Sequence, residues 1–575
     1  MAIIFGNNSP DQRILHQQYE VLKTRGSDTR HVLAQGAWHL GVGINESDAQ
    51  QAPSSGYYQQ DGCGIVVAGE VLTTTLSPLS AAELWRLFQD QGIAFVKQLH
   101  GAFVLAIVAR DVLYLVRDAA GQRTVYYQLE EGVFTFAIET KGVKVGGLAP
   151  AALYLPALFQ YLSYSFVPLE HTLLKGVKEL RAGCYVKFRH GDPEVQQDDF
   201  FTLTDIPKSE RQDLPYWSQR LRKEIDEDIQ QKLQHKEEVG VFLSGGLDSS
   251  IIAARVAQLH HRPIHTFSIH FGKKYPNENA FAKLVADRYQ TIHHEVEIKP
   301  QHFARRLPEI IRHLDEPSGD PITAPNFELA RYAREHVACI FNGEGGDPCF
   351  GGPKNMSMLL HHWYGEPVSR ERAYLASYRR GYQHLEQILL PEIFAQLDPV
   401  ADLERILTPY FEVPGLSFLD KLMRINIKLK GAHLILPKVE RMLGAHGFVP
   451  YAPLFSKKII ASSMEMPSNL KLYQGIEKYI LKVAFAEDVP DAIIKRPKSG
   501  MRVPVRYWFQ GELRRMAKQR LREDRIREGG IFEPKAIKEL LAYDRESGLD
   551  RHGLLLWMLL TFELWREQNL IVRGT

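Results

Sequence analysis

The sequence predicts an α/β protein in which an antiparallel α+β sandwich, residues 1–205, precedes a doubly wound parallel sheet, residues 206–575. The first part is filled by short alternating apolar segments with turns between them, which is the pattern of antiparallel strands. From residue 239 onward, buried strands alternate with helical segments, as expected of a parallel sheet with helices on both faces. The length of 575 residues also favours more than one domain.

In the first part, the expected strands span residues 62–71, 101–110, 111–118, 124–130 and 132–139, and the expected helices span 11–25 and 80–92. Residues 166–188 are predicted to close this part as a strand pair. The polar segment 191–215 then reads as a linker, and an amphipathic helix is expected over 216–234. We expect a second buried strand over 265–271, followed by a helix and a strand, and a terminal core helix near residue 560.

Composition excludes several functional classes. A net charge of +2 gives no case for nucleic acid binding. The absence of a long apolar run and of a basic, then apolar, start predicts a cytoplasmic protein without a membrane span or signal peptide. The cysteines are scattered and the histidine pairs at 293–294 and 361–362 are predicted to be surface or loop residues, so no zinc centre or disulfide framework is expected.

The segment SGGLDSS, residues 244–250, lies between an expected strand at 239–243 and an expected helix at 251–260. Such a turn directs several backbone N–H groups at one point near the positive end of a helix, which suits pyrophosphate. Glycine lets the backbone approach the anion, and serine hydroxyls add donors. Asp248 is predicted to hold a Mg²⁺ ion shared with the phosphates. The spacing and lysine of the Walker loop are absent.

SGGLDSS resembles the pyrophosphatase loop of the asparagine synthetase family. Four more segments resemble motifs of that family: the acidic loop 314–325, the glycine-rich loop 337–352, the segment 430–459 and the stretch 475–509. The resemblance implies an ATP-pyrophosphatase domain that adenylates a carboxylate and uses ATP and Mg²⁺. It places ATP or pyrophosphate against Phe242, Leu243, Ser244, Gly245, Gly246, Asp248, Ser249, Ser250, Ile269, Asn342 and Gly343.

The same resemblance assigns further roles. Asp347 would share the Mg²⁺ with Asp248, Glu344 would orient or deprotonate the attacking amine, and Lys498 would stabilise charge at the α-phosphate. Lys478 and Arg496 are further candidates for phosphate contact.

Two other groups of residues have open roles. The carboxylates Asp315, Glu316 and Asp320 would either cap a helix or lie near the substrate. Departures from the family pattern at Glu440, Leu443 and Tyr451 fall where the acceptor pocket is expected, which favours a specialised substrate.

Segments 25–28, 68–71, 117–127 and 136–141 resemble the glutaminase domain of the family, an Ntn-hydrolase-like fold. That chemistry requires an N-terminal cysteine nucleophile, but position 2 is Ala. Ala68 replaces the family's asparagine, and residues 41–45 lack its substrate-binding arginine. We therefore expect the fold without glutaminase activity, with nitrogen supplied by ammonia or by a substrate amine.

The sequence hypothesis is an AMP-forming amide synthetase acting on a small molecule or peptide that carries a carboxylate and an amine. Members without the glutaminase cysteine, such as β-lactam or carbapenam synthetases and lasso-peptide cyclases, resemble this arrangement. The alternatives are an ammonia-dependent asparagine synthetase and a non-catalytic nucleotide-binding homologue. The acid, the amine and the choice between intramolecular and intermolecular closure are left open, and a homodimer is allowed.

Overall fold

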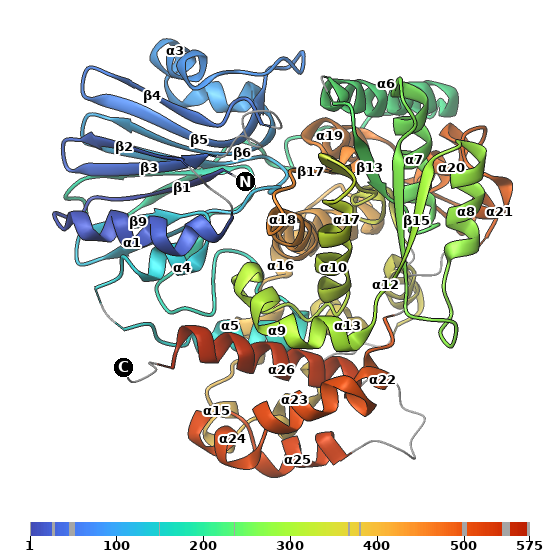
Figure 1. Cartoon of the computed structure of the whole chain (residues 1–575). Coiled ribbons are helices and arrows are strands. Elements are labelled where there is room, and N and C mark those ends of the chain that lie inside the picture. The colour runs from blue at the N-terminus through green and yellow to red at the C-terminus, as the bar shows by residue number, and fades with distance from the viewer. Residues whose placement is uncertain are drawn as a thin grey trace.

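The computed structural model describes residues 2–25, 29–44, 52–148, 150–234, 236–352, 354–365, 368–378, 381–496, 503–542 and 552–571. Within these residues, no helix is long and apolar enough to cross a membrane. Figure 1 shows two parts side by side, one built on antiparallel strands near the N-terminus and one built on a central sheet surrounded by helices.

The N-terminal part consists of two six-stranded antiparallel sheets, in the orders β10-β8-β9-β1-β3-β2 and β12-β11-β7-β6-β5-β4. The strands are β1 Ile3–Asn7, β2 Thr29–Gln35, β3 Trp38–Ile44, β4 Gly56–Gln60, β5 Cys63–Leu72, β6 His100–Ala109, β7 Val112–Arg117, β8 Tyr126–Glu130, β9 Val133–Ala137, β10 Lys178–Glu179, β11 Cys184–Arg189 and β12 Gln196–Asp199. The helices are α1 Gln12–Leu22, α3 Ala81–Gln91, α4 Thr140–Lys144 and α5 Leu155–Tyr164, with 3₁₀ turns at Lys23–Arg25 and Gly92–Gln98.

The alternation of side chains along each strand produces these layers. On β6, Val104, Ala106 and Val108 join the main core, whereas Leu105 and Ile107 join a second cluster beneath α3. Successive side chains of a strand point to opposite faces, so an apolar run such as β6 is buried on both sides. Helix α1 packs on the other sheet through β1 and β3. Both predicted helices and all five predicted strands are therefore confirmed.

The end of this part differs from the sequence prediction. β10 and β11 do not pair with each other: β10 pairs with β8, and β11 lies between β7 and β12 in the other sheet. The polar residues Gln196–Asp199, predicted as linker, form the edge strand β12. An edge strand pairs on one side only and can carry a polar sequence, which is why the apolar pattern gave no sign of it.

The C-terminal part is built on the parallel sheet β15-β14-β13-β16-β17. Its strands are β13 Val239–Phe242, β14 His265–His270, β15 Ile292–Glu297, β16 Cys339–Phe341 and β17 Pro450–Tyr451. Helices α6 Leu214–Leu233, α7 Leu247–Leu259 and α8 Asn279–Arg288 form one layer; α9 Pro300–Leu314, α10 Thr323–Ala333 and α18 Leu436–Gly444 form another (Figure 1). The doubly wound fold is confirmed, with its strand order reversing between β13 and β16.

Further helices surround this sheet. They are α11 Gly346–Phe350, α12 Lys354–Tyr364, α13 Arg370–Tyr378, α14 Leu385–Ile388, α15 Pro391–Phe394, α16 Thr408–Phe411, α17 Phe418–Ile425, α19 Lys457–Glu465, α20 Tyr479–Ala484, α21 Asp491–Ile494, α22 Val505–Gln510, α23 Glu512–Arg520, α24 Glu523–Gly529, α25 Pro534–Ala542 and α26 His552–Asn569. Short elements are the 3₁₀ turns Tyr382–His384, Pro453–Phe455 and Ser468–Leu470, the π-helical segments η4 Pro399–Glu404 and η5 Asn426–Ile435, and the hairpin β18 Leu472–Tyr473 with β19 Ile476–Glu477. Trp557 and Trp565 of α26 are buried, which confirms the predicted terminal core helix.

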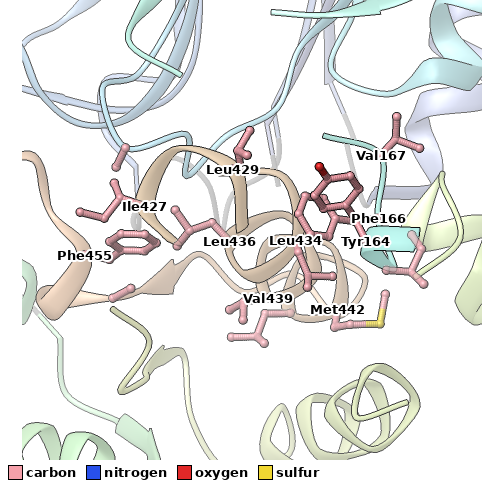
Figure 2. Packing of buried hydrophobic residues seen from close by; sticks show 14 of the residues in the cluster. Tyr164, Phe166, Val167, Ile427, Leu429, Leu434, Leu436, Val439, Met442 and Phe455 are labelled. Atoms are coloured by element: carbon pink, nitrogen blue, oxygen red, sulfur yellow. The ribbon is translucent and has the colours of Figure 1, made fainter. Parts of the chain in front are cut away.

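The two parts share one hydrophobic core. Figure 2 shows apolar side chains of η5 and α18, among them Leu434 and Met442, beside Tyr164 and Phe166 of the N-terminal part. Buried charges cross the same interface: Arg441 pairs with Glu139, and Arg117 donates to the Ala432 carbonyl at 2.9 Å. Because a buried charge is costly unless paired, these contacts fix how the parts meet.

Candidate active site

The two glycine-rich loops follow β13 and β16, the strands between which the sheet order reverses. Ligands of doubly wound sheets bind outside the carboxyl ends of the strands at such a reversal. In the first loop, Gly245 has φ +77°, and α7 begins just after Gly246. The Ser249 hydroxyl accepts from the Ser244 backbone N–H at 3.1 Å and holds the loop closed on itself.

The loops touch each other so closely that two positions accept only glycine. A Cβ on Gly343 would lie 2.6 Å from the Ser249 nitrogen, and one on Gly346 would lie 2.2 Å from Cγ of Asp248. Such separations are far shorter than any ordinary contact. The second loop therefore packs against the start of α7, which brings Asp347 close to Asp248.

Both aspartates form an ion pair with the same lysine, Lys478. The Lys478 ammonium lies 2.5 Å from Oδ1 of Asp347 and forms a second ion pair with Oδ2 of Asp248. Lys478 is only 2% exposed. Burial alone would lower its pKa, but the two carboxylates raise the pKa well above its ordinary value, so the side chain stays charged. The site thus holds a positive charge between two carboxylates from separate strand ends.

A pocket of about 330 Å³ opens beside this pair. Predicted residues that line it are Phe242, Leu243, Ser244, Gly246, Asp248, Ser249, Ile269, Asn342, Gly343, Glu344 and Asp347. Apolar residues that line it include Ile322, Leu329, Ile435, Val439 and Leu443. Polar residues that line it include Asn326, Asn355, Asn426, Lys430, Lys438, Glu477, Lys482 and Arg496. A mostly apolar cleft with a few convergent polar groups is the usual form of a small-molecule site.

Three predicted residues fall elsewhere. The backbone carbonyl of Gly245 accepts a hydrogen bond at 2.9 Å from Arg496, which lines the pocket. Ser250 is fully buried beneath the loop and is not among the residues that line the pocket. Lys498 belongs to 497–502, outside the described residues. The roles proposed for all of these residues stay predictions.

Of the three carboxylates of the acidic loop, Asp315 and Glu316 lie away from the pocket and Asp320 lies near it. Asp315 accepts from the backbone of Thr140 and Lys141, and Glu316 accepts from the Leu173 backbone at 3.0 Å. Both carboxylates thus bind the N-terminal part, which favours neither the helix cap before residue 326 nor the place near the substrate that the sequence left open for them. Asp320 lies nearer, since it pairs at 2.8 Å with Lys438, which lines the pocket.

Of the three departures expected to shape the acceptor pocket, only Leu443 lines it. Glu440 instead pairs with Arg25 at 2.6 Å across the domain interface. Tyr451 lies on β17, opposite Phe341 of β16. Sequence reasoning missed Glu477 and Lys482, which line the pocket from the turn and helix around Lys478. Their nearness to Lys478 in the chain was the only available signal.

Two family models match the chain: asparagine synthase over residues 220–567 and a glutamine amidotransferase domain over 1–200. The chain is 26% identical to asparagine synthetase (glutamine-hydrolyzing) 1 of Bacillus subtilis, a match that covers 82% of this chain and 78% of that protein. It is 26% identical to a putative asparagine synthetase (glutamine-hydrolyzing) of Mycobacterium bovis, over 83% of this chain and 78% of that one. Amidase chry2 of Gibberella zeae matches at 24% identity, over 62% of this chain and 59% of that protein.

Proposed function

The chain belongs to the asparagine synthase family, a family of ligases that form C–N bonds with ATP, and we propose that it is an AMP-forming amide synthetase. Residues 206–575 would adenylate a substrate carboxylate and let an amine attack it. Residues 1–205 would serve as a scaffold without glutaminase activity. The proposal rests above all on Asp248 and Asp347, which both pair with the Lys478 ammonium beside the glycine-rich loops.

The residues present fit a Mg²⁺ ion bound with the phosphates. Mg²⁺ is held by one or two carboxylates together with substrate phosphates and water, and two carboxylates already share the Lys478 ammonium here. Asp248 and Asp347 would hold the ion. When bound, it neutralises phosphate charge and orients the polyphosphate.

The backbone N–H groups of the first loop would bind the departing pyrophosphate at the start of α7. The substrate carboxylate would attack the α-phosphate, which breaks the bond to pyrophosphate and gives an acyl-AMP. An amine would then attack the acyl carbon, with AMP as leaving group. Glu344, which lines the pocket, would take the proton from the amine. Lys498 would stabilise the charge at the α-phosphate.

The proposed loss of glutaminase activity rests on the residues of the N-terminal part. Ala2 precedes β1, and Ala68 lies on β5. The cysteines of this part, Cys63 and Cys184, lie on β5 and β11 of the sheet that does not contain β1. Burial raises the pKa of Cys184 to about 12, so its thiol is not a ready nucleophile. The amine would therefore come from free ammonia or from a substrate.

A specialised acid is favoured by the apolar residues that line the pocket, among them Leu443. The substrate would be a small molecule or peptide that carries a carboxylate and an amine, as in the synthesis of natural products. Ammonia-dependent asparagine synthesis is the second candidate, supported by Glu344 at the pocket. A non-catalytic nucleotide-binding role is the third. The presence of both aspartates together with Lys498 argues against it, because Lys498 would act on charge that develops only during adenylation.

The test is release of pyrophosphate and AMP from Mg·ATP with a panel of acids and amines. We expect Asp248→Asn and Asp347→Asn each to lower turnover by roughly 10³-fold, because a bound metal contributes several kcal/mol to the transition state. Asp287→Asn, at an exposed ion pair on α8, is the matched control. Formation of ADP instead of AMP would refute the proposal. Turnover with aspartate and ammonia would favour the second candidate.

A further inference from the structure

Three histidines meet on the sheet of the C-terminal part, away from the glycine-rich loops. His265 is the first residue of β14, His294 lies on β15, and His336 follows the end of α10. One ring nitrogen of each lies within 4.8 Å of the other two, and all three side chains are half-buried. His294 was expected at the surface or in a loop, but its ring packs against this cluster.

We propose that His265, His294 and His336 bind a divalent transition-metal ion, with Zn²⁺ as the physiological candidate. Imidazole nitrogen is a preferred ligand of Zn²⁺, Cu²⁺ and Ni²⁺. Nitrogens bound at about 2.0–2.1 Å around a tetrahedral Zn²⁺ lie about 3.3 Å apart. Nδ1 of His265 lies 3.0 Å from Nε2 of His294, with which it shares a hydrogen bond, and one ring nitrogen of His336 lies within 4.8 Å of both, so the three nitrogens reach one ion once the rings turn toward it.

The surroundings of the rings orient them as ligands. The Tyr332 hydroxyl lies 3.3 Å from Nδ1 of His294, the nitrogen that faces away from the proposed ion. Metal-bound histidines usually use their second nitrogen in this way. Phe267 stacks on His294 with ring centroids 4.8 Å apart.

Aromatic stacking alone leaves one feature unexplained. Nε2 of His336 is buried and makes no hydrogen bond within the described part of the chain. A buried polar atom without a partner costs about 1–3 kcal/mol, and metal coordination would satisfy it. The tilted contact of His294 and His336, with ring centroids 4.4 Å apart and 34° between the ring planes, accounts for the packing of the rings but not for this nitrogen.

The proposed ion is distinct from the Mg²⁺ of the active site. His265 is four residues before Ile269, which lines the nucleotide pocket, so the two sites are roughly 13 Å apart along the strand. Phe267 lines the pocket as well and stacks on His294. An ion at the histidines would therefore fix one wall of the pocket. The inference does not depend on the proposed amide synthesis.

The experiment uses the full chain without a histidine tag, stripped with a chelator and titrated with Zn²⁺ and Co²⁺. We expect the protein to bind one equivalent of either ion. The Co²⁺-loaded protein should show the visible absorption of four-coordinate Co²⁺. His336→Asn should weaken binding by at least about 100-fold, and Tyr332→Phe by about 10-fold, as for outer-shell groups. His294→Phe, which preserves the stack, should abolish the Co²⁺ spectrum.

The matched control is His261→Ala, which removes a histidine of an adjacent pair outside the cluster. It should leave metal binding unchanged. The proposal is overturned if no saturable binding occurs, or if binding survives both His294→Phe and His336→Asn with the same affinity. In either case, the cluster is a structural stack only. If His294→Phe fails to fold, His336→Asn, which lies outside helix and strand, decides the question alone.

Discussion

Lys478 sets the charge balance of the candidate site. Its ammonium pairs with Asp248 and Asp347, and without it two carboxylates would face each other. Replacing Lys478 with Gln should lower the free energy of unfolding in chelator by about 3 kcal/mol, as for a broken buried ion pair. Added Mg²⁺ should stabilise this variant more than the wild type, because the ion would replace the lost charge. Denaturant titrations with and without Mg²⁺ measure both effects.

The matched control is Lys482→Gln, which removes another lysine from the pocket wall but leaves the aspartate pair bridged. It should respond to Mg²⁺ as the wild type does. An equal response of all three proteins to Mg²⁺ would contradict the assignment of Asp248 and Asp347 as the metal-binding pair.

At the residue scale, the sequence predicted those site residues that lie next to a strand and a glycine-rich motif in the chain. Asp248 and Asp347 each lie in the first turn of a helix that follows a buried strand and a glycine-rich loop, so their position at one sheet edge could be predicted. Lys478 could be named but not placed between them. It lies far along the chain in a left-handed turn, φ 54°, and only tertiary packing brings it to the loops. The role of Lys498 stays a prediction.

At the scale of elements, the contact between the two loops depends on Gly346. A Cβ there would lie 2.2 Å from Cγ of Asp248, where ordinary contacts begin near 3.4 Å. Gly346→Ala must displace either the Asp248 carboxylate or the second loop, so pyrophosphate release should fall at least about 100-fold, since a displacement of about 1 Å is worth that much. Gly56→Ala, with open space around the added Cβ, is the control. Unchanged turnover in Gly346→Ala would contradict the close packing of the loops.

Apolar alternation made part of the elements predictable. Strands β5 to β9 and helices α1, α3, α6 and α7 follow the periodicities of their residues. Strand β12 was missed because Gln196–Asp199 is polar and lies at a sheet edge. The pairing of β10 and β11 was wrong because local sequence cannot say which of two sheets a strand joins. Only the second error concerns partners that are distant in the chain, because β10 pairs with β8 and β11 with β7.

At the scale of the whole molecule, the two parts act on each other through buried charges. Glu440 was expected at the acceptor pocket, and Asp315 and Glu316 were expected either to cap a helix or to lie near the substrate, yet each binds the N-terminal part. Their partners lie more than a hundred residues away, and nothing in the local pattern distinguishes a substrate carboxylate from an interface carboxylate. The parallel sheet could be predicted because each β-α-β unit is formed by neighbouring segments of the chain. The domain interface could not, because it joins segments that are far apart in the chain.

Glu139 makes this interface sensitive to acid. Its side chain is 1% exposed; burial would raise its pKa, but Lys141, Arg441 and Arg25 together lower the pKa to about 2. A carboxyl whose pKa is lower in the folded than in the unfolded state stabilises the fold above the unfolded pKa, about 4.5, and loses that contribution as pH falls toward 2. The contribution at pH 7 is about 3 kcal/mol.

We therefore expect Glu139→Gln to melt well below the wild type at pH 7, with the gap narrowing as pH falls from about 4.5 toward about 2. Thermal unfolding followed between pH 7 and pH 3 measures this gap. The control is Glu237→Gln, which removes an exposed ion pair with Arg262 and should shift the melting temperature little at any pH, because such pairs contribute about 0–1 kcal/mol. A gap that stays constant with pH would mean that Glu139 acts through packing and not through its charge. A gap that closes in acid would show that protonation of one buried carboxylate weakens the contact between the glutaminase-like part and the synthetase part.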